Sequence, residues 1–138
     1  MSAENEAIVR RHYEEVCNGR KLEVAADIFA PDHVFDDPQV PTANGPDGVL
    51  AAVKTYQDGV NGHWDIQEIF SSGDEVVVRW IGSGTHVGEI NGIPPTGRAI
   101  KVDAITIHTV KDGRITWTRE TWDTLGFLQQ IGVVPGPA

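Results

Sequence analysis

The stretch Ala104–Trp122 reads AITIHTVKDGRITWTRETW and decides the fold, because it places two strand-like runs around a turn. Isoleucine, valine, threonine and tryptophan dominate both runs, and these residue types favour β-strands. Lys111-Asp112-Gly113 separates the runs and is typical of a hairpin turn. We therefore predict an antiparallel pair of strands, Arg98–Val110 and Arg114–Trp122.

The register of this hairpin decides which side chains share a face of the sheet. A two-residue turn would place Glu120 opposite Ile105, whereas a three-residue turn with a bulge at Gly113 would place it opposite Ala104. We favour the second register because it separates apolar from polar side chains. It groups Ile105, Ile107, Ile115 and Trp117 on one face. The other face then holds Ala104, Thr106, His108, Thr116, Thr118, Glu120 and Trp122.

The polar face is either exposed to water or turned toward a ligand. Solvated faces are usually rich in lysine and glutamate, whereas this one combines an alanine and several threonines with single charged and aromatic side chains. Ligand cavities typically have mostly neutral walls with a few placed polar groups, so the composition favours a cavity. A carboxylate beside an indole in a cleft has a raised pKa, which makes Glu120 the best candidate for acid–base chemistry. The alternative is a strand-edge glutamate paired with an arginine.

The rest of the chain predicts helices first and strands afterwards. An amphipathic helix is expected over Ala3–Asn18, a shorter one over Lys21–Phe29 that ends before Pro31, and a third from Pro46 to Val60. A brief strand is expected at Val34–Asp36, followed by a loop over Asp37–Gly45. Further strands are expected over His63–Phe70 and Asp74–Thr85, a loop over His86–Thr96, and a last helix over Thr124–Ile131 with Asp123 as its N-cap. This order is typical of an α+β fold.

Composition limits the possible functions. The 138 residues are enough for one domain, spanning 1–138, and the net charge of -9 disfavours nucleic acid as a partner. The sequence has no apolar run of about 18 residues and no N-terminal signal pattern, so we expect no membrane contact and a cytoplasmic location. The single cysteine, Cys17, is expected to pack inside the first helix. The five histidines match no metal motif and no GxSxG is present, so we expect neither a metal nor a hydrolase triad.

Other polar residues have structural explanations beside functional ones. Asp36 and Asp37 could point into the cavity or form an Asx turn before Pro38. Asp103 falls on the apolar face, where a salt bridge with Lys101 or Arg119 is expected. Tyr13 is expected in the core, with a hydroxyl that could reach the cavity.

Three stretches of the chain resemble the SnoaL-like polyketide cyclases of the NTF2-like superfamily. The first is Ile8–Tyr13 continuing to Asn18-Gly19, which is generic. The second is the loop Gly84–Arg98, GTHVGEINGIPPTGR, which is more specific, and the third runs from Lys111–Ile115 into Asp123–Gly132. The resemblance implies a cone-shaped α+β barrel in which a curved antiparallel sheet and N-terminal helices enclose a deep pocket.

The resemblance also implies a reaction. In these cyclases one acidic residue acts as acid and base in a cofactor-free intramolecular aldol ring closure. It lies six positions before a glycine that matches Gly126. That position is Glu120 here, where the family more often has aspartate, and a polar group on the neighbouring strand falls at Thr106. We therefore expect Glu120 to be catalytic and to act on a small hydrophobic carbonyl metabolite without a cofactor. Asp36, Thr106, His108, Tyr13 and Trp122 are the expected substrate-binding residues.

Two other functions remain open from the sequence. One is a proton shuttle like that of ketosteroid isomerases, using Tyr13, Asp36 or Asp37, and Asp103. The other is a non-catalytic domain that binds a hydrophobic metabolite. An exposed apolar face usually marks an interface, and related proteins pair through this outer face of the sheet, so we expect a homodimer or a tetramer.

Overall fold

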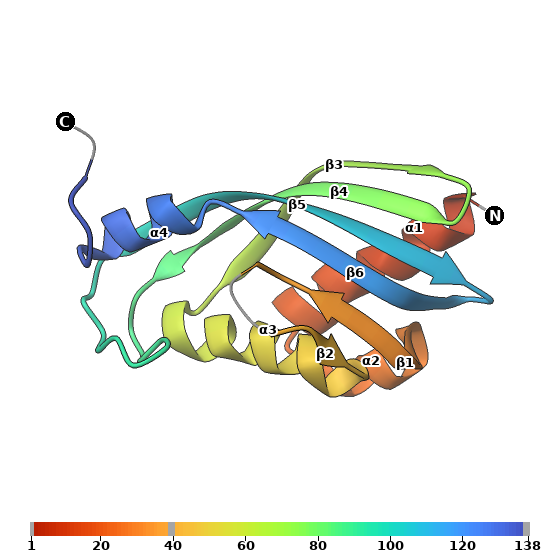
Figure 1. The fold of residues 1–138 in the computed structure, drawn as a ribbon, viewed down its shortest axis with the longest axis horizontal. Helices are drawn as coiled ribbons and strands as arrows, with labels where there is room; N and C mark the ends of the chain where they lie inside the picture. The colour runs from red at the N-terminus through yellow and green to blue at the C-terminus, as the bar shows by residue number, and fades with distance from the viewer. Residues whose placement is uncertain (1, 39–40, 137–138) are drawn as a thin grey trace.

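The structure is a computed structural model that describes residues 2–38 and 41–136. A curved sheet of six described strands lies over the helices (Figure 1). The helical segments are α1 (Ser2–Arg11), the π-helical η1 (His12–Asn18), the 3-10 helix η2 (Leu22–Val24), α2 (Ala25–Ile28), α3 (Pro46–Val60) and α4 (Thr124–Ile131). The strands are β1 (Phe29–Asp36), β2 (Ala43–Asn44), β3 (His63–Ser72), β4 (Glu75–Thr85), β5 (Ala99–Lys111) and β6 (Arg114–Trp122).

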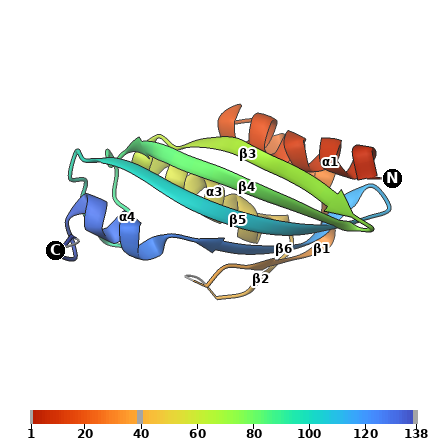
Figure 2. The ribbon, with the colours of Figure 1, turned by 90° about the horizontal axis from the view of Figure 1, so that it is seen from above.

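The strands are ordered β2-β1-β6-β5-β4-β3, so the described part of the sheet is open, with β2 and β3 at its edges. All pairs are antiparallel except β1 with β6, which run parallel. Viewed from above, α1 and α3 lie on the far side of the sheet and the near face is free of the described helices (Figure 2). The predicted α+β fold is confirmed. The described strands do not close into a barrel, and the helices cover the inner face of the sheet instead.

Alternating burial along β5 explains how this sheet separates its two faces. Ile100, Val102, Ala104 and Thr106 are buried, whereas the residues between them are exposed. Ile100 and Val102 share a buried cluster with Val60 of α3, and Ala104 belongs to a cluster that also contains Val49 and Val53 of that helix. Pro46 opens α3 as predicted, and α4 begins at the predicted Asp123, whose Oδ1 accepts a hydrogen bond from Gly126 N at 2.9 Å.

The predicted register of the β5–β6 hairpin is wrong in its pairs but right for most of its faces. The turn has two residues, with Lys111 opposite Arg114, and the register then shifts between Thr109 and Val110. The extra residue lies in β6, at Thr116, so Glu120 pairs with Thr106 and not with Ala104. A bulge reverses the side-chain alternation, so Ile115 turns inward and is fully buried instead of joining the outer face.

The N-terminal half also differs from the prediction in its detail. The first helix changes to π-helical winding at His12, and the second ends at Ile28 because Phe29 already pairs with Ile115 in β1. Pro31 therefore lies within β1, in the part of the strand where the register with β6 shifts and where a missing N–H is tolerated. Ala43–Asn44, predicted as loop, pairs with β1, while residues 39–40 of that loop lie outside the described range.

Candidate active site

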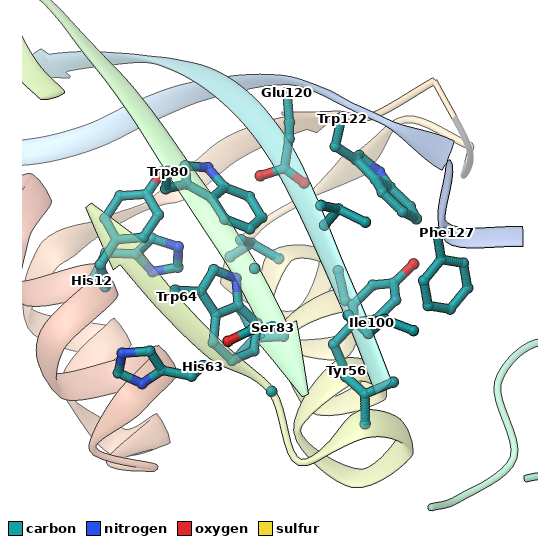
Figure 3. Close-up of a pocket in the computed structure, with 18 of the residues that line it drawn as sticks. His12, Tyr56, His63, Trp64, Trp80, Ser83, Ile100, Glu120, Trp122 and Phe127 are labelled. Carbon is teal, nitrogen blue, oxygen red and sulfur yellow. The ribbon is translucent and has the colours of Figure 1, made fainter. Parts of the chain in front are cut away.

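A cavity of about 60 Å³ lies between the inner face of the sheet, η1 and α3. Its walls are mostly apolar and rich in aromatic side chains, with Tyr56, Trp64, Trp80, Trp122 and Phe127 among the lining residues (Figure 3). Glu120 is the only carboxylate among the described residues that line it. Figure 3 shows its carboxyl group between the indoles of Trp80 and Trp122. The polar face of the hairpin is therefore turned toward a cavity and not toward water.

Hydrogen bonds from β4 and β5 hold the Glu120 carboxyl group. The Trp80 indole Nε1–H donates to Thr106 Oγ1 at 3.0 Å, and the Thr106 hydroxyl donates to Glu120 Oε1 at 3.1 Å. Because the indole can only donate, it leaves the threonine hydrogen directed at the carboxylate. The two bonds form a short relay that fixes the orientation of Glu120.

A second carboxyl group reaches Glu120 from the end of β1. Phe35 faces the core, Asp36 turns outward, and Asp37 turns back so that its side chain makes a hydrogen bond with Glu120. Asp37 Oδ2 also accepts a hydrogen bond from Trp122 Nε1 at 3.2 Å. The parallel pairing of β1 with β6, which sets Asp36 beside Arg119, brings this carboxyl group to the site.

The surroundings of Glu120 raise its pKa to about 8. Burial is the largest cause, the hydrogen bond and negative charge of Asp37 add to it, and the Thr106 hydroxyl acts in the opposite direction. At neutral pH Glu120 therefore holds a proton. A carboxyl group tuned in this way is a much stronger proton acceptor, once ionised, than an ordinary glutamate.

A chain of buried polar groups extends from the wall of the cavity into the protein. The Tyr13 hydroxyl is 2.9 Å from His108 Nε2, His108 Nδ1 is 3.0 Å from Thr118 Oγ1, and His33 Nε2 is 2.8 Å from the same oxygen. Burial lowers the pKa of His12 to about 3 and that of His33 to about 4, and it lowers the pKa of His108 well below its usual range. These histidines are neutral at physiological pH.

The structure brings together only part of the predicted site. Glu120, Tyr13 and Trp122 line the cavity. Thr106 and His108 are fully buried behind it, where they contact Glu120 and Tyr13 respectively.

Asp36 lies apart from the cavity, because strand alternation turns it to the outer side of the sheet. There its carboxylate accepts hydrogen bonds from Thr42 Oγ1 at 2.8 Å and from Trp117 Nε1 at 2.7 Å. It is absent from the described cavity lining. For Asp37, the sequence left open whether its side chain points into the cavity or forms an Asx turn, and the structure places it in contact with Glu120.

Two alternatives from the sequence do not fit this geometry. Arg119 pairs with Glu75 and lies over the Trp117 ring, so it is not the partner of Glu120. Asp103 lies on the outer face and pairs with Arg79 at 3.0 Å, which confirms an ion pair but with a different partner than Lys101 or Arg119. Asp103 therefore does not join Tyr13 in an isomerase-type trio.

Reasoning from sequence missed Trp80 and Tyr56 as well as the role of Asp37. Trp80 alternates with the buried Val76 and Val78 on β4, so its inward direction could have been inferred from strand periodicity. Cys17 is buried as predicted, with its Sγ 3.7 Å from His12 Nε2. Within residues 2–38 and 41–136, no group of three or more His, Cys, Asp or Glu side chains is placed to hold a metal ion, and no helix is long and apolar enough to cross a membrane.

The comparisons of this chain with known proteins agree on one protein family. The family model described as SnoaL-like polyketide cyclase matches residues 7–131. The chain is 30% identical over 134 residues to the aklanonic acid methyl ester cyclase DauD of Streptomyces sp. (strain C5), a match that covers 91% of this chain and 80% of DauD. It is also 30% identical over 131 residues to the aklanonic acid methyl ester cyclase DnrD of Streptomyces peucetius, covering 91% of this chain and 88% of DnrD.

A solved structure supports the same assignment. TsrD from Streptomyces laurentii superposes with a TM-score of 0.85 at 26% identity, covering 96% of this chain and 97% of TsrD. The expected NTF2-like α+β architecture is thereby confirmed, with a curved but open sheet. From its sequence match and its fold, this chain belongs to the SnoaL-like polyketide cyclase family.

Proposed function

We propose that this protein is a cofactor-independent cyclase that closes a ring in a hydrophobic, polyketide-like carbonyl substrate. The observation that carries the proposal is Glu120, a carboxyl group with a raised pKa facing an aromatic cavity. The names of DauD and DnrD, which describe cyclases of a polyketide ester, support the same substrate class. Glu120 is the proposed acid–base group, and Tyr13 and Trp122 are the proposed cavity contacts for the substrate.

The proposed reaction is an intramolecular aldol addition. A methylene group between two carbonyls is acidic enough to lose a proton to ionised Glu120 without a metal. The resulting enolate carbon attacks a carbonyl of the same molecule, one carbon–carbon bond forms, and the carbonyl becomes an alkoxide. Glu120 then returns its proton to the alkoxide oxygen. The protein supplies orientation and one mobile proton, and the sum of protons is unchanged.

Substrate binding requires the cavity to widen. A free volume of about 60 Å³ holds only a few water molecules. The aromatic side chains that line it, such as Tyr56 and Trp64, must therefore turn when a larger molecule enters. We expect binding to change the tryptophan fluorescence of the protein.

Turnover by wild type and by Glu120→Gln tests the proposal. Aklanonic acid methyl ester is the first substrate to try, followed by other polyketide esters that carry a 1,3-dicarbonyl group. We expect ring closure by the wild type and a loss of about 10²–10⁴-fold in kcat for Glu120→Gln, which keeps the shape but cannot accept the proton. Equal turnover by both proteins would overturn the role of Glu120. Tight binding without turnover by the wild type would indicate a carrier instead of an enzyme.

A further inference from the structure

Asp37 is the one acidic side chain in hydrogen-bonding contact with Glu120 among the described residues, and the proposed reaction gives it no role. We propose that Asp37 and Glu120 hold a single proton between them, and that Asp37 acts through Glu120 as a positioning residue for ring closure. The proposal rests on the proposed function for its catalytic consequence. The shared proton itself is a property of the resting protein and can be measured without a substrate.

The hydrogen bond between the two carboxyl groups accounts for a proton that they share. Two ionised carboxylates have only acceptor atoms, so a hydrogen bond between them exists only when one is protonated. Each carboxyl group also has a donor of its own, Thr106 for Glu120 and Trp122 for Asp37. These donors hold the two groups in place, Asp37 just after the end of β1 and Glu120 on β6.

Asp37 is placed to tune Glu120 without touching the substrate. Glu120 lines both the inner cavity and a groove on the outer side of the sheet, whereas Asp37 lines the groove only. The pair therefore lies between the substrate space and the outer surface. Asp37 therefore lies on the solvent side of the pair, and Glu120 lies on the cavity side.

The other titratable groups that face Glu120 leave Asp37 as its main electrostatic neighbour. Tyr13 and Cys17 on η1 and Tyr56 on α3 all have raised pKa values, largely because they are buried, and they are uncharged at neutral pH. Arg119, next in the strand, is bound to Glu75 on the outer face. The negative charge of Asp37 is therefore the main charge that strengthens Glu120 as a base.

Removal of this charge makes a specific change in the pH profile. Asp37→Asn keeps the shape but donates its amide N–H to Glu120, which favours the ionised carboxylate and lowers its pKa. The acid limb of the rate profile then moves to lower pH, while the rate at high pH falls because Glu120 is a weaker base. The two profiles cross. A purely structural role for Asp37 would lower the rate at every pH and leave the limb in place.

Carbon-13 NMR of the glutamate carboxyl groups tests the shared proton directly. The Glu120 resonance is assigned by its loss in Glu120→Gln. We expect it to titrate at about pH 8 in the wild type. In Asp37→Asn we expect the midpoint to fall by about one unit or more, and Asp37→Ser, which also removes the charge, serves as a second variant.

Asp36→Asn is the matched control, because it removes the adjacent carboxylate, which bonds to Thr42 and Trp117 instead. We expect it to leave the Glu120 titration unchanged. An unchanged midpoint in both Asp37 variants would overturn the proposal, as would a rate profile that falls without shifting. If Glu120→Gln keeps full turnover, the proposed function fails, and the NMR titration still decides separately whether the proton is shared.

Discussion

The raised pKa of Glu120 predicts that its replacement by glutamine stabilises the protein at alkaline pH. In the unfolded chain this carboxyl group ionises at its ordinary value of 4.5, whereas the folded protein holds the proton to about pH 8. Between these values the folded state binds more protons at Glu120, so the contribution of this group to wild-type stability falls as the pH rises, and the loss is complete above pH 8. The glutamine of Glu120→Gln has no such titration and keeps its amide N–H directed at Asp37.

The size of the effect follows from the shift in pKa. A change from 4.5 to about 8 corresponds to at most about 5 kcal/mol, at about 1.4 kcal/mol per unit. Relaxation of the ionised site reduces this figure, and part of the effect is already present at pH 5, so we expect the advantage of Glu120→Gln to grow by about 2–4 kcal/mol between pH 5 and pH 9. The same substitution should remove activity, which makes Glu120 a site where function costs stability.

Urea unfolding followed by tryptophan fluorescence at pH 5, 7 and 9 measures this difference. Glu23→Gln is the control, because Glu23 is exposed on η2 and its change should give the same difference in unfolding free energy at every pH. If the difference between Glu120→Gln and the wild type were independent of pH, the buried, protonated carboxyl group would be refuted.

Three further predictions follow from other parts of the structure. Thr106→Val should lower the unfolding free energy by about 1–3 kcal/mol and raise the pKa of Glu120, because the variant lacks the hydroxyl that donates to this carboxyl group. Thr109→Val is the control, because the Thr109 hydroxyl donates to Glu75 on the outer face, and it should leave the pKa of Glu120 unchanged. An NMR titration of both variants measures the difference. His33 binds a proton only in the unfolded chain between pH 6.5 and 4, so the unfolding free energy of the wild type should fall relative to that of His33→Gln as the pH drops through this range. A difference between the two proteins that stays constant with pH in urea unfolding would contradict this. Ile105 and Trp117 are 50% and 40% exposed on the outer face, and replacing both with lysine should convert the predicted homodimer to a monomer in light scattering; a monomeric wild type at micromolar concentration would remove the dimer.

Local patterns in the sequence were sufficient for most elements of the fold. Alternation of side chains placed Glu120 and Thr106 on one face, and Pro46, Asp123 and Gly132 marked helix ends through backbone chemistry that depends only on neighbouring residues. The bulge at Thr116 was not predictable in the same way. It depends on how Ile115 packs in the core, and a single inserted residue reverses every side chain beyond it.

The candidate site was only half predictable for a related reason. Glu120, Tyr13 and Trp122 are on elements whose inner faces follow from periodicity. The contact between Glu120 and Asp37 depends on the parallel pairing of β1 with β6, which joins distant parts of the chain and leaves no local signal. For the same reason, the sequence does not tell which of Asp36 and Asp37 contacts Glu120, because that depends on the strand with which β1 pairs.

The pH dependence of ring closure by the wild type and by Glu120→Gln tests the proposed role of Glu120 most directly. The wild-type rate should rise with pH to a plateau above about pH 8, as the cavity carboxyl group loses its proton. Glu120→Gln should have neither the plateau nor the limb. If Glu120→Gln closed the ring at the wild-type rate and with the same dependence on pH, the proposed role of Glu120 would be contradicted.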